Sequence, residues 1–525
     1  MSWGKRMAAK IEEIGLLLVH GIGEQKRLEH LRCTTKEIAS YVQSTPGLIR
    51  LAVDDQSEAK GLIILDVMFS DQGKKRRIRL NCQEVWWADL GMRGGPLAET
   101  AFWLWGLGQW AAEVHWKGRH ISNTSLLMDN PSFPGDAPGK PPGARKQVAV
   151  RAILFGADML AFLTLITWSL FKRVIAFITR TVPGPELIFL FLGDVKIYQQ
   201  PGGPGRGTPD DPDMPMRTTI RRRMVSAMTD MAEKRFDRWY ILAHSLGSVL
   251  AFNGVQETEW ALPNYLDEAT WRALSADFKT KDPYTPGKAP DLANMMPRRP
   301  PWLSDKDGIS RQALFGRFSG LVTYGAPLDK FAALWPRIVC VNKQPEAFPS
   351  NCEWLNIYDP TDPVGAPLDA FSQGPDKMMA PGNDGCRSSK AFLWSHIRYF
   401  TPRRRHENPI AAPLVDAILR GTRLTSAAKS SANSPATDAA RHMLAALQIL
   451  LLFAVMLVSA VVLAALASKL IANRYFGQCT AHWWSIACAR EILAGSIALL
   501  VLTVVAVSVA GGLRAGFYDR RFAGK

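Results

Sequence analysis

Residues 240–250, with the sequence YILAHSLGSVL, constrain the fold of this chain more than any other stretch. A short apolar run enters a small-x-Ser-x-Gly turn around Ser245 and then continues in a helical pattern. A serine on such a sharp strand-to-helix turn has the form of a nucleophile elbow, with its hydroxyl exposed for attack. Ala243 replaces the usual first glycine, and its small side chain still suits a crowded turn. The stretch predicts acyl transfer to Ser245, provided that an oxyanion-hole donor lies upstream and an acid and a histidine follow downstream.

The upstream partner is predicted near the N-terminus. Residues 14–19 form an apolar run that is too short for a helix and is typical of a buried parallel strand. The run ends in His20-Gly21-Ile22-Gly23, where glycines allow the backbone to turn tightly and bring an N–H close to a substrate oxygen. We predict that the backbone N–H groups of Ile22 and Leu246 form the oxyanion hole, with His20, Gly21, Gly23 and Gly247 supporting the two turns. The alternative is an ordinary strand-to-helix turn at residues 20–23.

The acid is predicted at the end of a later strand. Residues 354–358 form that strand and run into a loop with two carboxylates, Asp359 and Asp362. We favour Asp362 because it lies further into the loop and is followed by Pro-Val-Gly. Asp359 is the alternative acid, or it caps the turn.

Four histidines follow Asp362 in the chain: His396, His406, His442 and His482. The last two border long apolar segments, and His406 follows a run of three arginines. His396 lies among apolar residues that can hold an imidazole in place, so we predict it as the base. His244, next to the serine, is predicted to be structural, with its side chain directed elsewhere.

The order Ser245, Asp362, His396, with residues 20–23 upstream, resembles the α/β-hydrolase superfamily, and lipase- and esterase-like serine hydrolases in particular. The resemblance covers roughly residues 10–400, and strands at 62–67 and 82–87, with a strand and turn at 321–328, fit it. It implies an α/β fold with a mostly parallel sheet and a helical cap. It also implies a serine nucleophile, a histidine base and an aspartate that orients the histidine. No metal or other cofactor is expected.

Two uncharged apolar segments, residues 443–467 and 492–513, are each long enough to cross a bilayer as a helix. Basic residues precede the first segment and follow the second, which favours a cytoplasmic position for both flanks. Two buried core helices are the alternative. The N-terminal apolar run is short and ends in the predicted oxyanion motif, so it does not resemble a secretory signal. We therefore expect an integral membrane protein with a cytoplasmic hydrolase domain, at the inner membrane if the source is bacterial.

The sequence divides into segments of different composition. The predicted segments are a first hydrolase part at 10–128, an apolar insertion at 129–216, a second hydrolase part at 217–410 with a cap at 256–318, a helix and tether at 411–442, a transmembrane hairpin at 443–513 and a basic tail at 514–525. Pro/Gly-rich linkers flank the insertion, which is predicted as a membrane hairpin or a lid. A packed helical cap in a soluble domain is the alternative.

The net charge of +16 suits an anionic lipid surface, given the predicted spans. We see no nucleic-acid recognition motif and no indication of oligomeric state. The expected partners are therefore a lipid bilayer and a lipid or other acyl ester as substrate. Two alternatives remain: a non-catalytic membrane scaffold that reuses the hydrolase fold, and an acyltransferase in which an alcohol replaces water.

Overall fold

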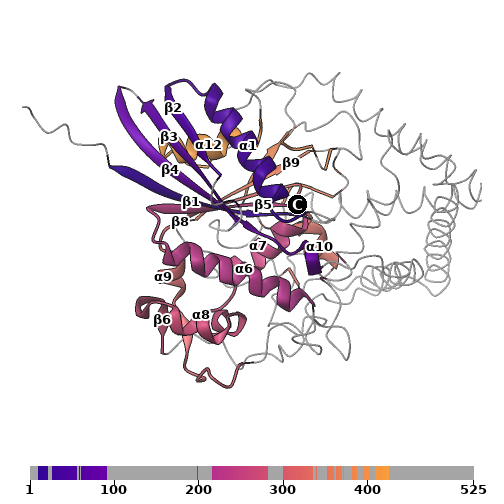
Figure 1. Cartoon of the computed structure of the whole chain (residues 1–525). Coiled ribbons are helices and arrows are strands. Elements are labelled where there is room, and N and C mark those ends of the chain that lie inside the picture. Colours follow the sequence, from indigo (N-terminus) through magenta and orange to yellow (C-terminus); the bar gives the residue numbers. More distant parts are fainter. Residues whose placement is uncertain are drawn as a thin grey trace, which may run out of the picture. The chain divides into compact units, whose positions relative to one another are not determined.

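An eight-stranded sheet forms the core of the described part of the chain (Figure 1). The structure is a computed structural model, and it describes residues 10–21, 26–90, 195, 198, 216–281, 299–339 and 352–424, with short gaps within the second, sixth and seventh of these. All of these residues belong to one compact unit of the chain. The strands are β1 (Ile11–Val19), β2 (Leu48–Asp54), β3 (Leu62–Asp71), β4 (Lys74–Val85), β5 (Arg238–His244), β8 (Phe318–Tyr324), β9 (Glu353–Tyr358) and β10 (Gly382–Gly385).

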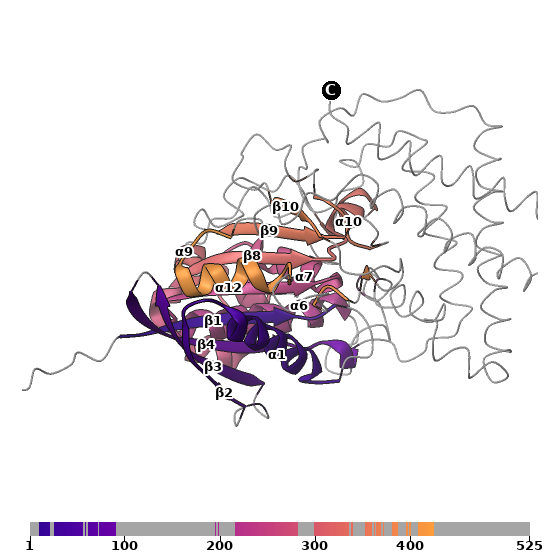
Figure 2. The same ribbon diagram turned by 90° about the horizontal axis from the view of Figure 1, so that it is seen from above.

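The sheet order is β10-β9-β8-β5-β1-β4-β3-β2, as Figure 2 shows from above. β3 runs antiparallel to β2 and β4, and every other neighbouring pair is parallel. The prediction of an α/β fold with a mostly parallel sheet is confirmed. Residues Ile14–Val19 of β1 and Trp239–Ala243 of β5 are buried and mostly apolar because helices cover both faces of these strands.

Helices pack on both faces of this sheet. Figure 1 shows α1 (Glu29–Ser44) and α12 (Ala411–Arg420) on one face, and α6 (Met216–Glu233) and α7 (Leu246–Val255) on the other. Alternate residues of β1 therefore enter different cores, and Leu16 and Leu18 lie in the one beneath α1 and α12. The carboxyl ends of the parallel strands meet at one edge, where ligand sites form in open α/β sheets.

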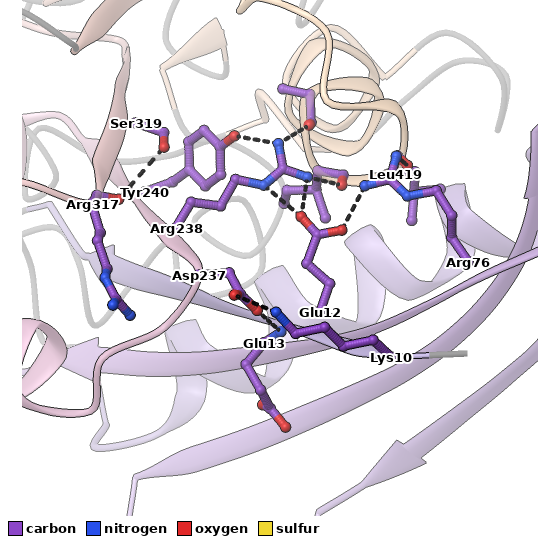
Figure 3. A network of polar contacts seen from close by, with 12 residues as sticks. Lys10, Glu12, Glu13, Arg76, Asp237, Arg238, Tyr240, Arg317, Ser319 and Leu419 are labelled. Carbon is purple, nitrogen blue, oxygen red and sulfur yellow. Dashed lines mark hydrogen bonds and ion pairs between the residues drawn. The ribbon is translucent and has the colours of Figure 1, made fainter. Parts of the chain in front are cut away.

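The C-terminus of α12 is fixed to the sheet by a charged network (Figure 3). Arg238 on β5 donates to the carbonyl oxygens of Ala417–Ile418, over 3.0 and 2.8 Å, and Arg76 on β4 donates to Leu419 over 2.6 Å. Glu12 on β1 accepts from both guanidinium groups. The last carbonyls of a helix have no intrahelical donor and carry partial negative charge, so the two cations satisfy and stabilise them.

The described part of the predicted cap, within residues 256–318, consists of short elements. They are η4 (Leu262–Tyr265), α8 (Glu268–Ala273), η5 (Ala276–Phe278), β6 (Lys279–Thr280), β7 (Gly308–Ile309) and α9 (Arg311–Phe315). This region packs on α6, where Arg221 pairs with Glu257 and Glu233 accepts hydrogen bonds from Ser275.

Several predicted segments lie outside the described residues. These are both predicted spans, the basic tail and almost all of the insertion at 129–216. None of the helices within the described ranges combines the length and the apolar character that crossing a bilayer requires. A further short helix, α10 (Leu328–Leu334), follows β8 in the chain.

Candidate active site

Ser245 forms the sharp turn between β5 and α7. Its backbone lies at φ 51°, ψ −128°, a strained conformation for a residue with a side chain. The turn is held by its N–H, which donates to the carbonyl of Tyr324 over 3.0 Å. A Cβ on Gly247 would lie 2.3 Å from the carbonyl oxygen of His20, so only glycine lets α7 start this close to the end of β1. Local crowding therefore explains the small-x-Ser-x-Gly pattern.

The structure brings Ser245, His396 and Asp362 together in one hydrogen-bonded line. Ser245 Oγ lies 2.8 Å from His396 Nε2, and His396 Nδ1 lies 2.9 Å from Asp362 Oδ2 and 3.1 Å from Oδ1. All three residues are buried, with 0%, 6% and 7% of their surfaces exposed, respectively. The serine hydroxyl faces the imidazole and not solvent, in contrast to the exposed hydroxyl expected of an elbow. Gly21 lies against the Cβ of Ser245, since a Cβ on this glycine would be only 2.7 Å away from it.

Asp362 is held as a carboxylate by several donors. The Val364 N–H donates to its Oδ1 over 2.7 Å, and the Tyr399 hydroxyl donates to its Oδ2 over 2.7 Å. Burial alone would raise the pKa of Asp362. The charge of His396 and the hydrogen bonds outweigh that effect and lower the pKa to about 2.

Asp359, the alternative acid, occupies a different place from Asp362, whose carboxylate bonds Nδ1 of His396. It lies at the end of β9, fully buried, and its N–H donates to the Tyr399 hydroxyl over 2.9 Å. Its carbonyl accepts from the N–H of Asp362 over 2.8 Å. Asp359 therefore shapes the loop that presents Asp362.

Two glycines make room for the acid and the histidine. Gly325 follows β8 at φ 57°, and a Cβ there would lie 3.2 Å from both Asp362 Oδ2 and His396 Cε1. A Cβ on Gly365 would lie 2.8 Å from the same Oδ2. Lys330 on α10 donates to the carbonyl of Val364 over 2.7 Å and fixes the far side of this loop.

His20 connects the first loop to the end of β4. Its Nδ1–H donates to the carbonyl of Gly21 over 2.7 Å, its Nε2 accepts from the N–H of Trp87 over 3.0 Å, and its ring stacks on that of Trp87. Burial lowers the pKa of His20 to about 4, so the ring is neutral near pH 7. Both ring nitrogens of His20 thus bond the backbone, at Gly21 and Trp87, and His20 supports the loop at Gly21.

The two predicted oxyanion donors differ in what the structure describes. Leu246 is the first residue of α7, and an N–H in the first turn of a helix has no intrahelical acceptor. A substrate oxygen beside Ser245 is an acceptor that this N–H can take. Ile22 and Gly23 lie outside the described residues.

His244 and Tyr399 contact the site but escaped the sequence analysis in that role. The His244 side chain, predicted to be directed elsewhere, lies against His396, with ring centroids 4.9 Å apart. Its Nε2–H donates to the carbonyl oxygen of His396 over 3.0 Å. For Tyr399, the one available signal is its position three residues after His396, a spacing that places both on one side of a helical turn.

Within the described part of the chain, no three His, Cys, Asp or Glu side chains are grouped to hold a metal ion.

A cleft of about 1240 Å³ lies between the end of β4, α6 and α8, bordered by Trp86, Arg222 and Tyr265 among others. Ser245, Asp362 and His396 are not among the residues that border it. The arrangement around Ser245 is a hydroxyl beside an imidazole whose other nitrogen bonds a carboxylate, a set of groups that can activate a serine for nucleophilic attack. Searches against protein-family models, curated proteins and solved structures found no match for this chain.

Proposed function

We propose that this protein is a serine hydrolase of the α/β-hydrolase type that cleaves a carboxylic ester through an acyl-enzyme on Ser245. The observation that carries the proposal is the 2.8 Å contact between Ser245 Oγ and His396 Nε2, with Asp362 bonded to the other ring nitrogen. The strained turn at Ser245 adds support, because strain of this kind concentrates at functional sites.

The proposed reaction begins with proton transfer, since a serine hydroxyl is a weak nucleophile until a base accepts its proton. His396 Nε2 takes the proton as Oγ attacks the ester carbonyl carbon, and the carbonyl π electrons move to the oxygen. The oxyanion is held by the N–H groups of Leu246 and Ile22. The intermediate collapses, the ester C–O bond breaks, and the leaving alcohol takes the proton from His396.

Water then completes the cycle by the same steps. It loses a proton to His396 as it attacks the acyl carbon, and collapse of the second intermediate returns the proton to Ser245 Oγ and releases the carboxylic acid. Asp362 keeps the hydrogen of His396 on Nδ1, so that Nε2 faces the serine as an acceptor in the resting site. Its lowered pKa is consistent with a carboxylate that stays ionised while the imidazole becomes charged.

We propose further that the predicted spans at 443–467 and 492–513 anchor the protein in a membrane, with the hydrolase domain on the cytoplasmic side. The net charge of +16 and the basic residues that flank the spans support this placement. A lipid or other acyl ester is the substrate class that suits a site beside a bilayer.

The test is labelling of the detergent-solubilised full chain with a serine-reactive fluorophosphonate. We expect the wild type to label, and Ser245→Ala and His396→Ala to lose the label. Ser248→Ala is the matched control, because this second buried serine of the turn bonds the carbonyl of Ser245 and not the histidine. A folded wild type that does not label would overturn the hydrolase proposal and favour the scaffold alternative. Product analysis with an added alcohol separates hydrolysis from acyl transfer.

A further inference from the structure

His244, the last residue of β5, contacts the histidine of the site in two ways. Its ring stacks on that of His396 with an interplanar angle of 28°, and on that of Tyr324 at a centroid distance of 4.7 Å. Its Nε2 lies 3.0 Å from the backbone carbonyl oxygen of His396. The contact therefore reaches both the ring and the main chain of the same residue.

The hydrogen bond fixes the tautomer of His244. A carbonyl oxygen can only accept, so the hydrogen lies on Nε2, and in a neutral ring Nδ1 then carries a lone pair. Burial, with His396 and His30 nearby, lowers the pKa of His244 well below its usual value, although Asp362 acts in the opposite direction. Nδ1 faces the loop at Gly21, because a Cβ on that glycine would lie 3.0 Å away from it.

We infer that His244 is a positioning residue of the proposed hydrolase, which holds His396 against Ser245 by binding its backbone carbonyl and supporting its ring. The inference rests on the proposed function. It goes further because it gives a mechanistic role to the variable position of the small-x-Ser-x-Gly turn.

The reason lies in how the two reacting residues are attached. Ser245 Oγ and His396 Nε2 come from loops distant in the sequence, so their 2.8 Å contact depends on how those loops sit. His244 precedes Ser245 directly in the chain. Its hydrogen bond to the His396 carbonyl therefore attaches the loop of His396 to the residue next to the nucleophile. A displacement of about 1 Å in such a pair can cost roughly 100-fold in rate. A link this close to the reacting atoms therefore affects turnover more than substrate binding.

The test compares His244→Gln with His244→Phe in the full chain. The glutamine amide keeps a donor of similar reach towards the His396 carbonyl, whereas phenylalanine keeps a stacking ring and loses the donor. The measurements are the second-order rate of fluorophosphonate labelling, kcat and KM with p-nitrophenyl butyrate, and the thermal unfolding midpoint. Thr229→Val is the matched control, since Thr229 on α6 is also buried and donates to a backbone carbonyl, but that carbonyl belongs to Val225 of its own helix and not to His396.

We expect His244→Phe to label roughly 10- to 100-fold more slowly and to lose kcat with little change in KM. His244→Gln should recover most of both rates at an unfolding midpoint similar to that of His244→Phe. Equal labelling of the wild type and His244→Phe would overturn the inference. So would equal losses in Phe and Gln that follow the unfolding midpoint, because they would indicate a merely structural role. If His244→Phe does not fold, His244→Gln and the control variant still test the inference. A labelling rate of His244→Gln no higher than that of Ser245→Ala contradicts the role of His244.

The outcomes separate this inference from the proposed function. A wild type that labels, beside an equally reactive His244→Phe, overturns the role of His244 alone. A wild type that does not label overturns the hydrolase proposal and the role together.

Discussion

The Tyr399 hydroxyl donates a 2.7 Å hydrogen bond to the same oxygen of Asp362 that lies 2.9 Å from Nδ1 of His396. The Tyr399 hydroxyl also accepts from the N–H of Asp359 over 2.9 Å. One buried phenol thus satisfies both the carboxylate and the backbone of the loop that carries it.

Tyr399→Phe should reduce labelling of Ser245 by fluorophosphonate by about tenfold, because a hydrogen bond to a charged group contributes about 1.5–3 kcal/mol and the N–H of Asp359 would lose its acceptor. The pKa of Asp362 should rise. Tyr240→Phe is the control, since it also removes a hydroxyl bonded within the protein, to Arg238, but at a distance from Ser245 along β5. Equal losses in both variants would contradict a role for Tyr399 in holding the acid.

Asp362→Asn should reduce turnover by roughly 10³- to 10⁴-fold, because an amide can donate to His396 and favour the wrong tautomer. Asp359→Asn should reduce it far less, since the carboxylate that bonds Nδ1 of the imidazole is that of Asp362. The measurement is kcat for a chromogenic ester at matched protein folding. The reverse order of losses would make Asp359 the acid.

Gly325→Ala should impair both activity and stability, whereas Gly73→Ala should affect stability alone. Both glycines have positive φ, at 57° and 80°, so alanine costs roughly 1–2 kcal/mol of backbone strain at either position. Only at Gly325 does the new Cβ press on Asp362, His396 and Tyr399, whereas no atom lies within 4 Å of a Cβ at Gly73. Labelling rates measured well below the unfolding midpoint separate the two effects, and an active Gly325→Ala would show that the site tolerates displacement.

Stability should fall as the pH decreases from about 6.5 towards 4, and His20 should cause part of the loss. Burial lowers its pKa from 6.5 to about 4, so between these values the unfolded chain binds the proton that the folded chain excludes. The contribution of His20 is complete above pH 6.5 and amounts to roughly 3 kcal/mol. Urea titrations in detergent at pH 7 and pH 4.5 measure it. His20→Gln should have the shallower pH dependence, and an unchanged slope would refute the assignment.

The sequence predicted the residues that meet at the site better than it predicted the sheet. Ser245, Asp362 and His396 are recognisable because each follows a strand or a loop with its own local signal, and chain order limits the choice of histidine. The position of β1 between β4 and β5 depends on pairing between distant segments that no local pattern specifies, whereas the reversed β3 pairs with β2 and β4, its neighbours in the sequence.

Side-chain direction was the harder part of the site to predict. His244 points towards His396 only because the strained turn at Ser245 and the loop of His396 meet in three dimensions. In the sequence, nothing distinguishes Tyr399 from other aromatic residues. Its role depends on the loop of Asp359 and Asp362, which bonds its hydroxyl in the folded protein. Both roles arise from tertiary contacts, which local propensity does not contain.

The charged network at the C-terminus of α12 also determines where the chain can be shortened. Arg76 and Arg238 donate to its last carbonyls, so a truncation before residue 411 would leave two part-buried guanidinium groups without those acceptors. Leu424 is still 93% shielded, since only 7% of it is exposed, and its N–H bonds the carboxylate of Glu353. A fragment designed for crystallisation should therefore end after Leu424, because an earlier boundary would remove contacts between this C-terminal segment and the sheet that carries Ser245.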